Sequence, residues 1–269
     1  MAAVYNVPLG GALIAAEIMY GSISLPIVLP ALLCSAVATA TSWLFLPDAV
    51  TYLAIPAYHA SASVFVWSVI AAPVIGLVSV GYVRLIGWVS FHRVAGPAGA
   101  VAPLVAFSVL GVIGVRYPQL FGNGKDMAHD AFLGNGTVLL FLALFALKPI
   151  VTALCLGSGA TGGLFTPALS TGAVLGAFLG GLWLHVWPVA HHGAPVGAYA
   201  VVGAAAMIAA ATQAPLSALV LVLELTRTTD TLMVPMIIAA AIATTLARYL
   251  DGYSIYSARL PAASREAVP

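Results

Sequence analysis

Apolar residues along this chain form long runs that short polar or Gly- and Pro-containing stretches interrupt. The runs predict apolar segments near 9–20, 25–46, 63–90, 98–114, 135–156, 165–187, 197–211, 215–226 and 232–250. Polar connectors at 92–103, 116–136 and 185–197 are expected to lie outside a bilayer. Crossing the hydrocarbon core takes about 20 apolar residues per helix, and several runs are shorter. We therefore expect re-entrant or broken helices that their neighbours shield from lipid, an arrangement typical of transporters and channels.

The scarcity of charge excludes a soluble globular protein. The 269 residues include 9 Lys and Arg and 8 Asp and Glu, so charged side chains make up 6% of the chain, against about 25% in ordinary soluble domains. Hydrophobic residues make up 62%, and the stretches 18–47, 49–83 and 149–223 contain no Asp, Glu, Lys or Arg. We therefore predict an all-α, polytopic integral membrane protein and expect it in the cell membrane.

Other features of the composition narrow the function classes. A net charge of +1 leaves no basic stripe for nucleic acid. Cys34 and Cys155 lie in apolar runs without CxxC spacing and are interpreted as small core residues. His185, His191 and His192 have no Cys or carboxylate at ligand spacing, so we predict no metal site. The chain carries no Ser-His-Asp, HExxH or paired-carboxylate arrangement, so we predict neither an enzyme nor a bound cofactor.

An internal repeat relates the two ends of the chain. Residues 2–17 read AAVYNVPLGGALIAAE and residues 209–224 read AAATQAPLSALVLVLE, with five identities at a constant offset of 207. The matched polar pairs are Asn6 with Gln213 and Glu17 with Glu224. Alanine-rich apolar segments also match by chance, but an amide residue ahead of Pro-Leu and a terminal glutamate at fixed spacing favour a real repeat. Two-fold repeats with broken helices build the central site of many transport proteins.

The longest uncharged stretch contains the glycine-rich segment GSGATGGLFTP, at 157–167. Its GxGxxG spacing does not indicate a dinucleotide loop, because that needs a soluble βαβ unit and an acid about 20 residues on, whereas the next acid is Glu224. Glycines let backbone approach a ligand, and Pro167 is tolerated in a first helical turn. Such a helix would begin with unpaired N–H groups and about half a positive charge, which favour an anion. Leu164 and Phe165 would be the donors, and a helix-packing turn is the alternative.

These residues resemble a known family. GSGATGGLFTP is similar to the anion-binding motif of the ClC voltage-gated chloride channels and chloride/proton exchangers, GSGxxGG running into GxFxP. Further segments that resemble the family are YNVPLGGALIAAE at 5–17, AAATQAPLSALVLVLELT at 209–226 and GYSIYS at 252–257. The resemblance implies the family's inverted-repeat architecture, with a partial transmembrane domain over 1–260 and a short C-terminal tail over 261–269.

The resemblance also implies a site and partners. Leu164 and Phe165 would donate backbone N–H groups to chloride, and Tyr256 would donate its hydroxyl, with Tyr253 as the competing tyrosine. The anion-loop glycines would be Gly157, Gly159, Gly162 and Gly163. The implied function is transport of chloride or a similar monovalent anion through a pore in each subunit of a homodimer in the lipid bilayer.

One departure from the family pattern concerns the start of the domain. Family members carry, ahead of the Asn-x-Pro-Leu segment, a Gly-Ser-Gly-x-Pro loop whose serine contacts chloride and a Gly-Lys/Arg-Glu-Gly-Pro turn whose glutamate gates the pore, and neither occurs here. Subtracting 207 from 165 places the counterpart of Phe165 at position −42, ahead of Met1. We therefore expect an N-terminally truncated domain.

A second departure concerns proton coupling. Family exchangers carry an internal proton glutamate at the position of Ile18, so the resemblance favours channel-like anion movement that is uncoupled from protons. Glu17 is one position away, which on a helix points it about 100° aside, and a structural role mirrored by Glu224 is the preferred interpretation. The alternatives are a chloride/proton antiporter and a truncated, non-conducting remnant or interaction subunit.

Four charged residues lie inside or at the ends of apolar segments. A charge at the centre of a membrane helix costs about 2.5–3.5 kcal/mol on insertion scales. Glu17, Arg84, Lys148 and Glu224 are therefore expected to face protein or water, most of them at helix ends or in packing contacts. Lys148 precedes the glycine-rich segment and could also raise the local anion concentration electrostatically.

Overall fold

The computed structural model describes residues 1–188, 195–227 and 230–260, and the regular elements in these ranges are all helices. The α-helices are α1 (Ala2–Tyr5), α2 (Pro8–Ile14), α3 (Leu25–Ser42), α4 (Ala62–Phe91), α5 (Pro97–Arg116), α6 (Lys125–Leu133), α7 (Val138–Gly157), α8 (Phe165–Val186), α9 (Val196–Thr212), α10 (Pro215–Thr226) and α11 (Met233–Leu250). A π-helical turn, η1 (Ala15–Met19), continues α2. Short 3₁₀ turns are η2 (Pro118–Leu120), η4 (Asp230–Leu232) and η5 (Ser257–Arg259).

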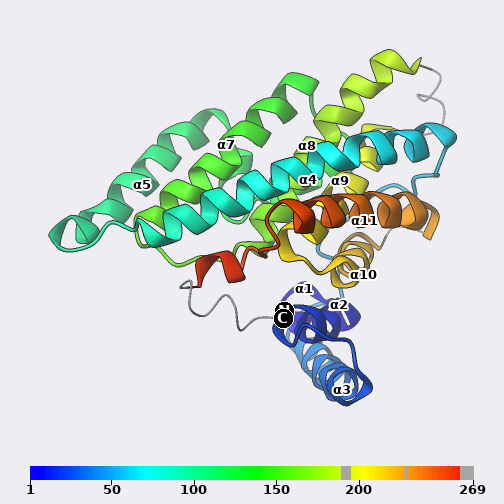
Figure 1. Cartoon of the computed structure of the whole chain (residues 1–269), viewed down its shortest axis with the longest axis horizontal. Helices are drawn as coiled ribbons and strands as arrows, with labels where there is room; N and C mark the ends of the chain where they lie inside the picture. The colour runs from blue at the N-terminus through cyan, green and yellow to red at the C-terminus, as the bar shows by residue number, and fades with distance from the viewer. Residues whose placement is uncertain (189–194, 228–229, 261–269) are drawn as a thin grey trace.

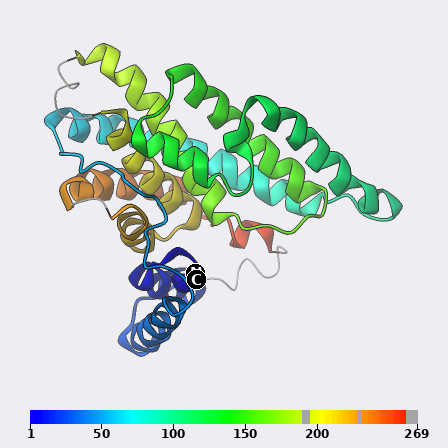
Figure 2. The same cartoon turned by 180° about the vertical axis from the view of Figure 1, so that it is seen from behind.

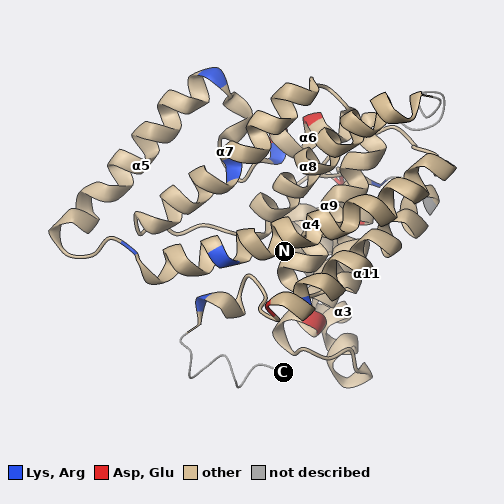
Figure 3. Ribbon diagram, turned by 45° about the horizontal axis from the view of Figure 1, so that its top comes forward, with Lys and Arg blue, Asp and Glu red and all other residues tan. Residues whose placement is uncertain are grey.

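The hydrophobic runs predicted most helices to within a few residues. In the described ranges, six helices are long and apolar enough to cross a membrane, namely α3, α4, α5, α7, α8 and α11. The shorter apolar helices include α9 and α10, as expected for broken or re-entrant segments. The prediction of an all-α, multi-pass architecture is confirmed, and Figure 3 shows how few Lys, Arg, Asp and Glu residues its helices carry.

The prediction that 116–136 is a connector outside the bilayer missed one helix. This stretch contains α6, which packs against α8 and α9 and buries Met127, Ala128, Ala131 and Phe132. Those positions recur at helical spacing and form an apolar face. The polar residues between them lowered the average hydropathy, so the run was too polar to be recognised as a packed helix.

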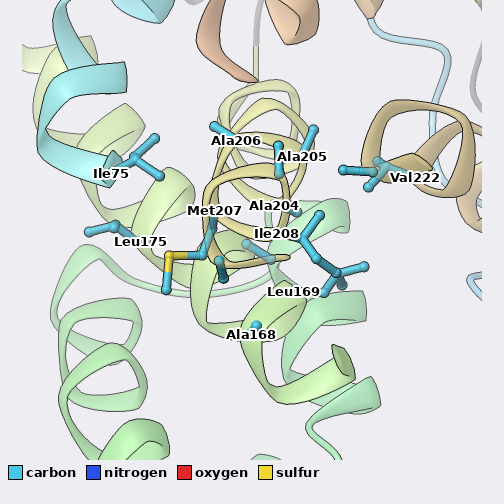
Figure 4. Close-up of a cluster of buried hydrophobic side chains, with 14 of the residues drawn as sticks. Ile75, Ala168, Leu169, Leu175, Ala204, Ala205, Ala206, Met207, Ile208 and Val222 are labelled. Carbon is cyan, nitrogen blue, oxygen red and sulfur yellow. The ribbon is translucent and has the colours of Figure 1, made fainter. Parts of the chain in front are cut away.

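The centre of the molecule is the contact between α8 and α9. Nearly every residue of α9 is buried, and α8, α11, α4 and α10 pack around it. Figure 4 shows part of this buried cluster. Glycines let the two backbones meet: a Cβ on Gly203 would lie 2.6 Å from the Cα of Gly176, and one on Gly176 would lie 2.4 Å from the carbonyl oxygen of Tyr199. Small residues at helix contacts are the usual means of close packing in membranes.

The internal repeat is confirmed by the backbone. Asn6 and Gln213 both adopt left-handed conformations, with φ of 56° and 60°. The next residues also match, since Val7 has φ −131° and ψ 72° and Ala214 has φ −129° and ψ 74°. Each pair interrupts the chain just before a proline that begins a new helix, α2 or α10. The same local sequence therefore produces the same break at the two ends of the chain.

Two glutamates connect the repeats reciprocally. Glu17 accepts from the backbone N–H groups of Leu216 (3.2 Å) and Ser217 (2.6 Å) at the start of α10. Glu224 accepts from those of Leu9 (3.0 Å) and Gly10 (2.6 Å) at the start of α2. Each carboxylate thus satisfies free donors at the N-terminus of the opposite repeat's helix, where negative charge is also favoured. These hydrogen bonds support the preferred interpretation of Glu17 as a structural residue mirrored by Glu224.

The first repeat lies beside the last. Figures 1 and 2 both show α1, α2 and α3 gathered on one side of the molecule, with α10 as their neighbour. An ion pair reinforces this contact, because Arg227 binds Asp48 at 2.8 Å and Asp48 also accepts from the Asn6 amide at 2.6 Å. The Asn6 hydrogen bond and the Arg227 guanidinium hold the pKa of Asp48 below its usual range.

Candidate functional site

The glycine-rich segment forms the link between α7 and α8. Gly159 has φ +94°, a left-handed conformation that side-chain-bearing residues rarely adopt, and the segment then runs into Leu164. Leu164 is the capping residue of α8, and Phe165 is its first helical residue. No side chain caps the helix. The prediction that this segment delivers the chain to the start of a helix is confirmed.

The start of α8 offers backbone donors inside the protein. The first N–H groups of a helix have no partner within it, and in the described ranges the N–H groups of Leu164, Phe165 and Thr166 have no other acceptor. All three residues are buried, and α8 is a 22-residue helix. Free N–H groups and the positive end of a long helix dipole meet here in the uncharged part of the chain, a setting that suits an anion.

A polar chain that the sequence did not predict lies beside these donors. The Thr166 hydroxyl is 3.1 Å from that of Tyr5, and the Asn123 amide reaches the Tyr5 hydroxyl at 3.5 Å. Tyr5 and Thr166 are 161 residues apart, so no local spacing could have paired them.

Tyr256 lies in the segment that follows α11. The N–H of Ile255 donates to the carbonyl of Ala211 at 2.7 Å, so the segment is held against the end of α9. Tyr256 is partly exposed, and its hydroxyl makes no hydrogen bond within the described residues. Burial raises the pKa of Tyr256, which favours the protonated phenol that can donate a hydrogen bond. No hydrogen bond joins Tyr256 to the start of α8, and its role at an anion stays a prediction.

Tyr253, the competing tyrosine, lines a polar cavity. Its volume is about 650 Å³, and Glu17, Ile18, Arg248 and Ser254 line it as well. Ile18, at the predicted proton-glutamate position, therefore borders this cavity with a side chain that has no proton to exchange. The adjacent Glu17 carboxylate is already occupied by two N–H groups of α10. The arrangement places no free carboxylate at the Ile18 position.

Metal binding finds no support in the described residues. Within the part of the chain that the structure describes, no group of three His, Cys, Asp or Glu side chains could hold a metal ion. His185 bonds through Nδ1 to the carbonyl of Gly181 at 2.8 Å. His191 and His192 lie outside the described residues.

Sequence comparisons identify relatives. A family model described as voltage gated chloride channel matches residues 1–248. The H(+)/Cl(-) exchange transporter ClcA of Klebsiella pneumoniae (strain 342) is 38% identical over 149 residues, which are 55% of this chain and 31% of that protein. ClcA of Salmonella arizonae is 40% identical over 147 residues, 55% of this chain and 30% of that protein. The matched part is thus about a third of the length of these relatives.

Solved structures share the fold. A slow cyanobacterial Cl⁻/H⁺ antiporter superposes with a TM-score of 0.81 at 22% identity, covering 94% of this chain and 60% of that one. A CLC-type fluoride/proton antiporter gives a TM-score of 0.72 at 21% identity, covering 95% of this chain and 62% of that one. Nearly all of this chain therefore has a counterpart in both structures, whereas a substantial part of each has none here.

Proposed function

Because this chain belongs to the voltage-gated chloride channel family, whose model matches residues 1–248, we propose that it moves chloride or a similar monovalent anion across the membrane. The chain is an integral multi-pass membrane protein. The observation that carries the proposal is the buried start of α8, where Leu164 and Phe165 present free N–H groups. Dipolar donors hold an anion by replacing part of its hydration shell and still release it, as conduction requires.

We further propose that anion movement is uncoupled from protons. The support is the isoleucine at position 18 and the engagement of the neighbouring Glu17 carboxylate by α10. The relatives compared above are named or described as exchangers or antiporters, so chloride/proton exchange is the second candidate. The two differ in one measurable quantity, the uphill movement of protons.

Vesicles containing the purified full chain are expected to lose chloride down its gradient once valinomycin carries the balancing potassium, without pumping protons uphill. Chloride release is followed with an electrode and internal pH with a trapped dye, and protein-free vesicles are the control. Proton movement driven by the chloride gradient would establish the exchanger instead. Chloride release at the protein-free rate would support a non-conducting remnant or interaction subunit.

The family resemblance implies a homodimer, and we propose that its two copies associate through α3. Only 6% of the α3 span is buried within the chain. Its large exposed side chains include a stripe at every fourth position, Leu25, Leu29, Leu33 and Val37. Packing of such faces drives helix association in lipid, and two-fold pairing is the commonest symmetry.

Cys34 provides a test of this interface because it is exposed on α3. A flexible bis-maleimide added to membranes is expected to join two chains into a band of twice the monomer mass. Cys34→Ser is expected to remove that band, and Cys155→Ala is expected to keep it. The proposal fails if chains stay monomeric, or if cross-linking falls in proportion when the protein is diluted with lipid.

A further inference from the structure

Lys148 is a buried cation that the proposed transport site does not use. It lies within the membrane-spanning helix α7, and 2% of the residue is exposed. Its ammonium donates to the carbonyl oxygens of Leu120 at 3.0 Å and Gly122 at 2.9 Å. The two ion pairs found in the described ranges are Arg84–Asp251 and Arg227–Asp48, so no carboxylate of these residues neutralises Lys148.

Burying a charge without a counterion is costly. Each ion removed from water loses several kcal/mol of hydration even after the protein relaxes, and neutral carbonyl partners recover part of it. An ammonium carries three N–H donors, and the two carbonyls take two of them. Neutral carbonyls do not cancel the charge of an ammonium, so the protonated Lys148 side chain keeps its positive charge and one N–H donor. Ionisable residues in such positions usually serve an ion or substrate.

The loop over Lys148 fixes its position. Residues 120–124 supply both accepting carbonyls, and the loop then turns at Gly124, whose φ is +83°. A Cβ on Gly124 would lie 2.9 Å from Cε of Lys148 and 2.5 Å from Oγ of Ser170. The absence of a side chain on Gly124 thus lets the loop close over the lysine.

A cavity borders Lys148 and the loop whose carbonyls hold its ammonium. Its volume is about 210 Å³, and Lys148 borders it together with polar residues and with the loop into α8. The polar and loop residues that line it are Asn123, Thr152, Cys155, Thr161, Gly162 and Leu164. Water occupies about 30 Å³ per molecule in the liquid, so the cavity can hold a halide ion with part of its hydration shell. No Asp or Glu is among its lining residues.

We propose that this cavity is a second anion site, in which the Lys148 ammonium binds a small monovalent anion. Hydroxyl and amide groups of the lining complete its coordination. Leu164 borders the cavity and also carries one of the free N–H groups of α8, so an anion held by Lys148 is positioned next to the proposed transport site. This proposal concerns anion binding only, so it does not depend on whether the chain transports anions.

Cys155 makes the site measurable because it lines the same cavity. In purified full chain carrying Cys34→Ser, an uncharged thiol reagent such as N-ethylmaleimide labels Cys155. Bromide, exchanged for gluconate at constant ionic strength, is expected to slow this labelling at least threefold with saturating dependence. Lys148→Met is expected to abolish the protection, and Lys148→Arg, which keeps the charge, is expected to retain it.

Three results would overturn the proposal: labelling that bromide leaves unchanged, equal protection in Lys148→Met, or protection that Tyr256→Phe removes while Lys148→Met keeps it. The last would assign the effect to the transport site. Thr161→Trp provides a second test if Lys148→Met does not elute as a folded protein. Thr161 is exposed at the cavity, so the larger side chain is expected to fill the cavity and end bromide protection.

Discussion

Replacing Leu164 with proline is expected to abolish measurable anion binding at the start of α8. The substitution removes one N–H donor, and hydrogen bonds to charged groups contribute about 1.5–3 kcal/mol, or roughly 10- to 150-fold in affinity. Proline also fixes φ near −65°, whereas Leu164 has φ −106°, so the neighbouring donor of Phe165 shifts as well. Bromide titration by calorimetry of the purified chain measures the loss.

Matched variants separate the backbone donor from the side chain. Leu164→Ala keeps the N–H group and is expected to stay within a few-fold of the parent affinity. Tyr256→Phe removes a hydroxyl and is expected to weaken binding about 3- to 10-fold, in line with about 1 kcal/mol for an ordinary hydrogen bond. Repeating the titrations in a Lys148→Met background removes the contribution of bromide binding in the Lys148 cavity. Unchanged affinity in both Leu164→Pro and Tyr256→Phe would remove the assignment of this site.

Truncating Glu17 is expected to give the largest loss of stability. Glu17→Ala leaves the N–H groups of Leu216 and Ser217 without their acceptor at the start of α10. Two charge-assisted bonds and the favourable dipole contact are lost, and the bond to Leu216 is exposed, so we expect a loss of about 2–4 kcal/mol. Glu224→Ala is expected to cost a similar amount because it removes the mirrored pair at α2.

Thermal unfolding in detergent, followed by circular dichroism, measures this loss. Glu17→Gln is the matched control, since its amide oxygen still accepts a hydrogen bond without the charge, and it is expected to lose about half as much. In the double variant the two losses are expected not to add, because both contacts join the same pair of helices. A melting temperature that Glu17→Ala leaves unchanged would contradict the structural role of this residue.

Hydropathy was sufficient to locate the helices, because a membrane helix is long and apolar over its whole length. The bounds of α10 were predicted to the residue, since Pro215 begins the helix and the polar Arg227 follows it. Helix α6 was not predicted because polar residues on its other face lower its average hydropathy. Hydropathy does not show which helices pack against each other. Only the repeat offset indicated that Glu17 and Glu224 are equivalent.

Some residues of the candidate site could be predicted from local sequence, and others could not. Leu164 and Phe165 could be predicted because a glycine-rich loop, a proline and an apolar run mark a helix start locally. Tyr256 was predicted by resemblance alone, because its distance from α8 depends on tertiary arrangement, which no local pattern encodes. The Tyr5–Thr166 contact and the carbonyl partners of Lys148 join segments far apart in sequence, so neither spacing nor composition encodes them.

The long sequence separation of the reciprocal glutamate contacts also implies an order of assembly. Leu9 bonds to a residue 215 positions later, and Glu17 bonds to one 199 positions later. Helix α2 is therefore made long before α10 leaves the ribosome, and its free N–H groups cannot be left in lipid. Contacts between such distant residues form slowly. Docking of the first repeat against the last is thus a late step of biogenesis. Until then, water or the insertion machinery must supply hydrogen-bond partners for the N–H groups at the start of α2.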